Sequence, residues 1–275
     1  MKTIGIIYNP LSQAAPDFAH RVEEWLHARG VRAWIGTSQE GRHDPAHVSE
    51  CDLLLALGGD GTVLRTARLA IPYGIPILGV GLGRLSFMAE VTPDELYSGL
   101  ERLIEGGGWY DERTLAQAAL YRDGMLIVED TALNEVLIAR GEIARVVAVE
   151  VAVDGTPMTT YTADGVIVAT ATGSTAYALA AGGPILDPRA QPLVLVPVAA
   201  HLTNVPSLVL HQDARLELIV RSRHPAFLSF DGQIHYQLHE GDHIHASRSP
   251  LVCRFARVHP PSHFYETLTR RLHRE

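Results

Sequence analysis

The first hundred residues alternate short apolar runs with segments in which apolar residues recur every three or four positions. The apolar runs, which predict β-strands, lie at residues 3–8, 31–35, 52–57 and 75–80. The segments with helical spacing lie at residues 18–26, 62–70 and 93–105. Strands that alternate with helices are typical of a parallel sheet covered by helices. We therefore expect an N-terminal α/β region built on a parallel sheet.

The pattern changes after the glycine-rich stretch "EGGGW" at residues 105–109. From there on, β-like segments flank short turns, "RDG" at 122–124 and "VDG" at 153–155, which predict hairpins. We expect this second part of the chain to be mostly antiparallel. Near the end, Phe264, Leu268 and Leu272 recur at four-residue spacing and predict a final helix.

Composition and charge narrow the class of protein. The chain has 275 residues, of which 47% are hydrophobic, and a net charge of −8. This balance is typical of a soluble globular protein and gives no general attraction to nucleic acid or anionic lipid. Any phosphate contacts must therefore be local.

Cysteine usage and the apolar runs bear on the compartment. Cys51 and Cys253 form no CxxC pair, which suits buried thiols in a reducing compartment. The apolar start ends at Asn9 and is too short for a signal peptide, and the longest later run, residues 193–200, is too short to span a bilayer. We expect a cytoplasmic protein without a membrane or nucleic-acid partner.

The clearest candidate for chemistry is "GGDGT" at residues 58–62, between a predicted strand and a predicted helix. Gly58, Gly59 and Gly61 would expose backbone N–H groups at a helix N-terminus, where phosphate oxygens are favoured. A carboxylate there, Asp60, would repel phosphate unless it accepts a proton from an attacking hydroxyl or holds Mg²⁺. The alternative is a tight turn in which Asp60 caps the helix. Three glycines around one acid favour the functional interpretation.

Two further segments carry polar residues beside predicted strands. Residues 162–184, "TADGVIVATATGSTAYALAAGGP", pass from a strand into hydroxyl side chains, glycines and Tyr177, a composition that suits a purine or ribose against the backbone. A close-packed small-residue helix or a β-corner is the alternative, and the segment alone favours it. In "LNEVLIARG", residues 133–141, Asn134 and Glu135 would on their own be interpreted as solvated side chains.

Histidines cluster in "FDGQIHYQLHEGDHIHASRS", residues 230–249. His243 and His245 share one face of a predicted strand, a spacing that can bind a metal ion. The chain has 14 histidines, and no carboxylate or cysteine completes a ligand set by spacing. We therefore attribute the alternation to a partly exposed strand and assign no metal-ligating residue.

Taken together and in this order, these segments resemble the NAD kinases, which transfer a phosphoryl group to the 2′-hydroxyl of the adenosine ribose of NAD to give NADP. The first motif is shared with phosphofructokinases and with diacylglycerol and sphingosine kinases, whereas "TGSTAY" with "GGP" and "NE" is more specific. The motifs that carry the resemblance are "GGDGT" (58–62), "GRLSFMAE" (83–90), "NEVLIARG" (134–141), "DGVIVATATGSTAYALAAGGP" (164–184) and "DGQ" (231–233).

The resemblance implies a fold and an assembly. It implies a phosphofructokinase-like parallel α/β domain for the phosphate donor, residues 1–112 and 253–275, to which the C-terminal segment returns. Residues 113–252 would form an antiparallel β domain that binds NAD. NAD would lie between the domains of a homo-oligomer, a dimer or tetramer, in which a neighbouring subunit supplies part of the site.

The resemblance also implies roles for individual residues. Asp60 would be the general base, with Mg²⁺ or another divalent cation and with ATP or polyphosphate as donor. The residues expected to meet phosphate are Gly58, Gly59, Gly61 and Thr62. The residues expected to bind NAD are Phe87, Asn134, Glu135, Asp164, Thr172, Thr175, Ala176 and Tyr177. Asp231 is matched by its motif, without an assigned role.

Some positions depart from the commonest pattern of that family. Gly81, Ser86 and Met88 replace residues of a usual "NLGRLGFL" run, and Ala171 replaces a proline. Val205 stands where an arginine is usual, which bears on donor preference or assembly rather than on the reaction class.

Two other functions remain open at the level of sequence. A lipid or small-molecule kinase of the same glycine–aspartate superfamily would keep Asp60 but would have no use for "TGSTAY" or for Asn134 and Glu135. A non-catalytic sensor of NAD or NADP is the second alternative, and the presence of Asp60 argues against it.

Overall fold

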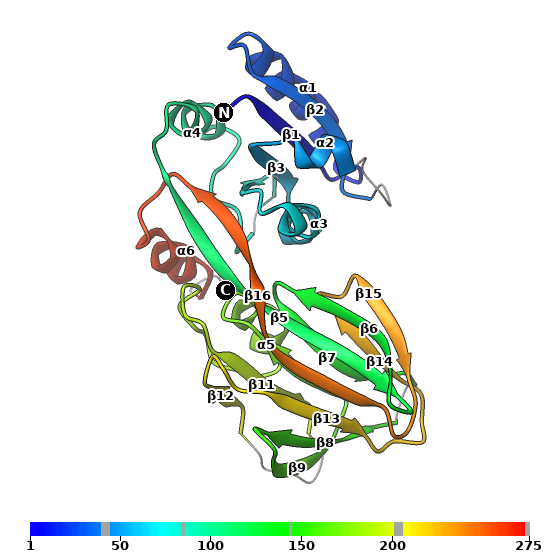
Figure 1. Ribbon diagram of the computed structural model, residues 1–275. Coiled ribbons are helices and arrows are strands. Elements are labelled where there is room, and N and C mark those ends of the chain that lie inside the picture. Colours follow the sequence, from blue (N-terminus) through cyan, green and yellow to red (C-terminus); the bar gives the residue numbers. More distant parts are fainter. Residues whose placement is uncertain (40–44, 84–85, 143–144, 201–205, 273–275) are drawn as a thin grey trace. The chain divides into compact units, whose positions relative to one another are not determined.

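The computed structural model describes residues 1–39, 45–83, 86–142, 145–200 and 206–272 (Figure 1). The chain divides into two compact units, which are described separately. Unit 1 comprises Met1–Glu112 and Cys253–Glu275, and unit 2 comprises Arg113–Val252. Val205 lies outside the described residues.

Unit 1 is built on a parallel sheet, as the alternating pattern predicts. Its strands, in sheet order, are β2 (Arg32–Thr37), β1 (Thr3–Tyr8), β3 (Leu53–Gly58) and β4 (Ile77–Gly81), followed by the C-terminal part of β16 (His243–Arg257). The return of the chain is seen in β16, where Phe255 pairs in parallel with Ile77 of β4. The helices are α1 (Ala15–His27), α2 (Pro45–Ser49), α3 (Asp60–Ala70), η1 (Ile71–Tyr73), α4 (Leu96–Ile104) and α6 (His263–Leu272).

The core of unit 1 explains why β3 reads as an unbroken apolar run. Every residue of β3 is buried, as expected for a central strand of a parallel sheet with both faces covered. Phe18, Val22 and Leu26 of α1 pack in the same core as Leu55, which confirms the predicted apolar face of that helix. Helix α3 begins at Asp60, two residues before the predicted start.

Unit 2 consists of two antiparallel sheets, which confirms the predicted change of architecture. One sheet has the order β12 (Leu208–Leu210), β11 (Leu193–Val198), β10 (Gly165–Ala169), β7 (Glu135–Arg140), β14 (Ala226–Phe230), β15 (Ile234–Leu238). In the other, β16 is followed by β13 (Leu216–Val220), β8 (Val147–Val153) and β9 (Thr156–Ala163), while β5 (Trp109–Arg122) pairs with β16 and with β6 (Met125–Ala132). The loop after β10 holds η2 (Gly173–Thr175) and α5 (Tyr177–Ala180).

Turn chemistry and packing hold unit 2 together. Asp123–Gly124 and Asp154–Gly155 all have positive φ, as the tight turns between β5 and β6 and between β8 and β9 require. Side chains from both sheets share one buried core, and Ile167, Ala169 and Ala178 belong to a second, smaller cluster of buried residues.

Cys51 and Cys253 are both buried thiols, in agreement with the sequence-based expectation. In the part of the chain that the structure describes, no helix has the length and hydropathy needed to span a membrane.

Candidate active site

Asp60 is the first residue of α3, separated from β3 by Gly59 alone, and its carboxylate is held by the loop that follows β4. Oδ2 accepts a hydrogen bond from the backbone N–H of Phe87 at 2.9 Å, and Oδ1 accepts one from that of Met88 at 3.0 Å. Oδ1 also accepts a hydrogen bond from the hydroxyl of Ser86, which in turn accepts one from the N–H of Ala89 at 2.8 Å. Residues 86–89 therefore form a cradle that fixes the carboxylate.

This arrangement leaves acceptor capacity on the Asp60 carboxylate. A carboxylate offers about four lone-pair sites, and the donors described above occupy three of them, only one on Oδ2. Oδ2 can accept a further hydrogen bond, such as one from a substrate hydroxyl. The capping alternative is wrong, because Gly59 rather than Asp60 occupies the N-cap position of α3.

The three glycines of "GGDGT" differ in what a side chain at each position would meet. A Cβ on Gly58 would collide with the side chain of Thr62, which is buried. Packing against Thr62 therefore accounts for Gly58 without any ligand. A Cβ on Gly59 would meet no atom of the described residues within 4 Å, so the space over the N-terminus of α3 is open there. Gly61 is similarly open, because the nearest atom to a Cβ placed on it would be Arg65 Nη1 at 3.6 Å.

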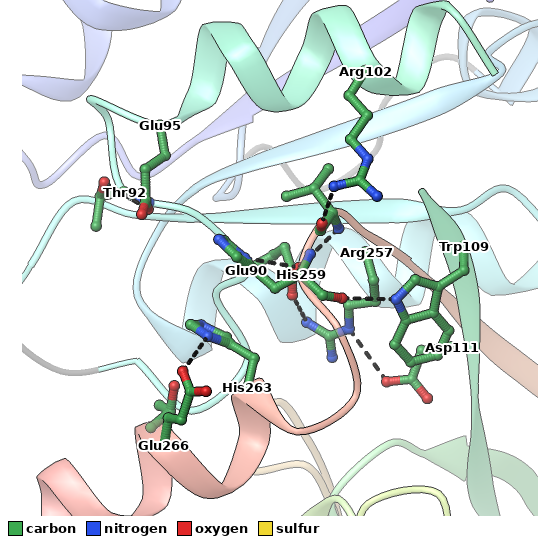
Figure 2. A network of polar contacts seen from close by, with 12 residues as sticks. Glu90, Thr92, Glu95, Arg102, Trp109, Asp111, Arg257, His259, His263 and Glu266 are labelled. Carbon is green, nitrogen blue, oxygen red and sulfur yellow. Dashed lines mark hydrogen bonds and ion pairs between the residues drawn. The ribbon is translucent and has the colours of Figure 1, made fainter. Parts of the chain in front are cut away.

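A buried polar network anchors the end of the cradle (Figure 2). Glu90, which follows the cradle directly, accepts hydrogen bonds from the N–H groups of Val258 at 2.8 Å and His259 at 2.7 Å. Its other oxygen contacts Arg257 Nη1 at 2.9 Å, and Arg257 Nε contacts Asp111 at 3.2 Å. The network ties the cradle to the segment that leads from β16 into α6. The sequence predicted no role for either Glu90 or Arg257.

A cavity of about 680 Å³ lies beside this network, within unit 1. Ser86 of the cradle lines it, as do His259 and His263, whose rings stack with centroids 4.3 Å apart. Glu95 and Arg270 also line the cavity. Space for a polar molecule therefore exists next to the residue that holds Asp60.

In unit 2, Asp231 organises the start of β7. It lies in the turn between β14 and β15 with φ of 51°. Its carboxylate accepts hydrogen bonds from the N–H groups of Leu133 at 2.8 Å, Asn134 at 2.7 Å and Glu135 at 3.1 Å. The structure thus gives Asp231 the role that the sequence did not: it positions the backbone of Asn134 and Glu135.

Asn134 and Glu135 present buried polar atoms without partners. Asn134 Oδ1 and Glu135 Oε2 are shut off from solvent and make no hydrogen bond among the described residues. Burial, and secondarily the negative charge of Asp231, raises the pKa of Glu135 to about 8. The interpretation of these side chains as solvated is therefore wrong. Buried polar groups are normally paired, so these two atoms keep hydrogen-bonding capacity that a ligand could use.

The small-residue loop packs directly against Asn134. The hydroxyl of Thr170 donates to the carbonyl of Leu133 at 2.6 Å. The backbone N–H of Thr170 donates to the carbonyl of Asn134 at 2.9 Å. A Cβ on Gly173 would collide with the backbone of Asn134. Part of the loop is a short helix, as the alternative interpretation proposed, but its close approach brings Thr172 and Thr175 to the same end of β7 and β10.

The other expected site residues have the following surroundings. Thr172 is buried, and its hydroxyl contacts Arg113 Nη1 at 3.3 Å. Asp164 pairs with Arg140 Nε at 2.9 Å, with both side chains about one-third exposed. Tyr177 is 43% exposed at the start of α5, beside the half-buried Ala176. Phe87 is half-buried and belongs to unit 1, in the cradle of Asp60.

Comparison with known proteins identifies the family. The family model of the ATP-NAD kinase N-terminal domain matches residues 37–108, and that of the ATP-NAD kinase C-terminal domain matches residues 133–258. An NAD kinase of Chloroflexus aggregans is 57% identical over 274 residues, which cover 100% of this chain and 99% of the relative. An NAD kinase of Dehalococcoides mccartyi, strain CBDB1, is 42% identical over 272 residues, covering 98% and 96%.

Solved structures share the fold over nearly the whole chain. A yeast NADH kinase complexed with NADH superposes with a TM-score of 0.87 at 22% identity, covering 99% of this chain and 87% of the other. An NAD kinase from Archaeoglobus fulgidus in complex with ATP gives 0.78 at 23% identity, covering 97% and 98%. From the two domain matches and the full-length relatives, together with this fold, it follows that the chain belongs to the NAD kinase family.

Proposed function

We propose that this protein phosphorylates the 2′-hydroxyl of the adenosine ribose of NAD, using ATP or another phosphoryl donor such as polyphosphate, and releases NADP. Membership of the NAD kinase family supports this reaction. The observation that carries the mechanism is Asp60, whose Oδ2 keeps acceptor capacity at the N-terminus of α3.

The geometry of unit 1 supports Asp60 as the general base. A ribose hydroxyl is a weak nucleophile at neutral pH, so a positioned carboxylate that accepts its proton lowers the barrier to attack. The cradle of residues 86–89 orients the carboxylate before substrate arrives. The open N-terminus of α3 at Gly59 offers backbone N–H groups and the positive end of the helix dipole to the donor's phosphates.

The unpaired atoms of unit 2 support an NAD-binding role for that unit. With a pKa of about 8, Glu135 carries its proton at pH 7 and can donate a hydrogen bond, while Asn134 Oδ1 can accept one. Adenine and ribose offer both donors and acceptors, so the pair complements an adenosine. The residues proposed to bind NAD with them are Phe87, Asp164, Thr172, Thr175, Ala176 and Tyr177.

We propose Mg²⁺ or another divalent cation as the cofactor. Mg²⁺ prefers oxygen ligands and usually binds through one or two carboxylates together with substrate phosphates. The remaining acceptor position of Asp60 is assigned to the ribose hydroxyl, and the described residues show no cluster of carboxylates around it. The donor's phosphates would therefore supply most of the ligands. When bound, the ion neutralises charge on the transferred phosphoryl group.

We also propose that the protein works in the cytoplasm as a homo-oligomer. Buried thiols at Cys51 and Cys253 are in keeping with a reducing compartment. The assembly follows from the family resemblance, and light scattering coupled to size-exclusion chromatography tests it.

The reaction is tested by incubating the purified protein with NAD and Mg²⁺, and with ATP, polyphosphate or no donor in parallel. NADP is expected only where a donor is present, and the comparison of donors settles the preference. Folded protein that binds NAD and forms no NADP with any donor would overturn the proposal and favour a sensor.

A further inference from the structure

Three side chains with metal-binding atoms meet on the second sheet of unit 2. Glu217 comes from β13, and His243 and His245 come from β16. One ligand atom of each lies within 4.8 Å of those of the other two. The sequence offered only the two histidines, because the carboxylate that joins them is on a different strand, 26 residues before His243.

The strand register places the three donors on the same face. β13 and β16 are neighbours in the sheet (Figure 1). They run antiparallel, and Glu217 lies opposite His245 while Ile219 lies opposite His243. The residues between them, such as Leu218 and Ile244, are buried in the core. Because side chains alternate along a strand, Glu217 and both histidines must stand on the outer face.

Local contacts already restrict these side chains. Nδ1 of His243 lies 3.1 Å from Oε1 of Glu217, with 44% and 41% of the two side chains exposed. The ring of His245 packs against Tyr121 of β5 with the centroids 5.3 Å apart. Two donors are thus held by a hydrogen bond and the third by an aromatic contact, which reduces the entropy lost on binding an ion.

We propose that Glu217, His243 and His245 bind one divalent transition-metal ion of the Zn²⁺ or Ni²⁺ class, which links β13 to β16. Two imidazoles and one carboxylate are a donor set that suits Zn²⁺, Ni²⁺ and Cu²⁺, whereas Mg²⁺ prefers oxygen ligands alone. An ion pair would need only Glu217 and His243. His245 is the additional donor that distinguishes a metal site from a surface ion pair.

The surroundings leave room for the ion's remaining ligand. A cavity of about 280 Å³ is lined by both histidines together with Tyr121, Asp123 and Gly124. A water molecule there would complete four-coordination around three protein ligands. No residue of this site belongs to the proposed catalytic or NAD-binding set, so the inference does not depend on the proposed function.

The test uses full-length protein from which metal has been removed with a chelator. Zn²⁺ is titrated into this protein in the presence of excess Mg²⁺, and binding is measured by isothermal titration calorimetry. The unchanged protein is expected to bind one equivalent of Zn²⁺ per chain and to melt at a higher temperature with it. The double variant His243→Gln/His245→Gln should lose that equivalent and the thermal shift. Glu217→Gln removes one of the three direct ligands and should weaken binding by more than the roughly ten- to a hundredfold that losing an outer-shell partner costs.

A matched variant controls for the other histidines. His20 and His211 are also exposed and also lie beside a carboxylate, Glu23 and Asp213 respectively. His20→Gln/His211→Gln should keep the equivalent of Zn²⁺. Circular dichroism establishes that every variant is folded. Equal binding by the two double variants, or no Zn²⁺ bound by the unchanged protein, would overturn the proposal.

Discussion

The hydroxyl of Ser86 donates a hydrogen bond to Oδ1 of Asp60 and accepts one from the N–H of Ala89 at 2.8 Å. Ser86 thus joins the proposed base to the backbone of the loop that holds it. This side chain stands where the commonest family pattern has glycine, which has no hydroxyl. The orientation of Asp60 in this chain therefore depends on a contact that its own sequence supplies.

Replacing Ser86 by alanine removes that contact and leaves the two backbone donors to Asp60 in place. We expect Ser86→Ala to lower kcat by about ten- to a hundredfold, since a hydrogen bond to a charged group contributes about 1.5–3 kcal/mol and 1.4 kcal/mol corresponds to tenfold. The Michaelis constant for NAD should change little. Steady-state kinetics of NADP formation measures both.

The control for this variant is Ser98→Ala. Ser98 is exposed in the first turn of α4, and its hydroxyl donates to the carbonyl of Glu95, its one hydrogen bond among the described residues. Its kcat should equal that of the unchanged protein. If Ser86→Ala is equally active, Ser86 does not help to position the base.

The sequence suggested candidate site residues but not their hydrogen-bonding partners. "GGDGT" predicted Asp60 between a strand and a helix because periodicity and glycines are local signals. The contacts of Asp231 with residues 133–135 join positions 96–98 apart, and those of Glu90 with residues 257–259 join positions 167–169 apart. Such pairs form only when strands and loops come together in the fold. Glu217 was missed beside His243 for the same reason.

The raised pKa of Glu135 predicts how stability depends on pH. The ordinary pKa of this group is 4.5, and in the folded protein the pKa is about 8. Between these values the folded state holds a proton that the unfolded state releases, so stability falls as pH rises from about 4.5 to 8, by at most ~1.4 kcal/mol per pH unit.

Glu135→Gln removes this titration and keeps the shape of the side chain. Without ligand, the variant should therefore melt at a higher temperature than the unchanged protein at pH 8, with a smaller difference at pH 6.5 and the smallest at pH 5. Differential scanning calorimetry at the three pH values measures the effect. A difference that does not vary with pH would contradict the raised pKa.

The buried pairs of Arg257 with Glu90 and Asp111 predict a large effect on stability. Side chains of all three are at most 9% exposed. Arg257→Met would remove the cation that the two buried carboxylates share, and breaking a buried pair in this way typically costs about 3–5 kcal/mol. Arg254→Met, which breaks an exposed pair with Glu112, should cost about 1 kcal/mol or less. Urea unfolding measures the free energy of unfolding of both variants. Equal losses would contradict a larger contribution of the buried network to stability.

The most direct test of the central claim is the turnover of Asp60→Asn, measured together with its affinity for NAD. The amide keeps the size of the side chain but is a very poor proton acceptor. We expect NAD to bind within a few-fold of the unchanged protein while kcat for NADP formation falls by roughly two to four orders of magnitude, the scale of a lost general base. Near-normal turnover in this variant would remove Asp60 from the mechanism.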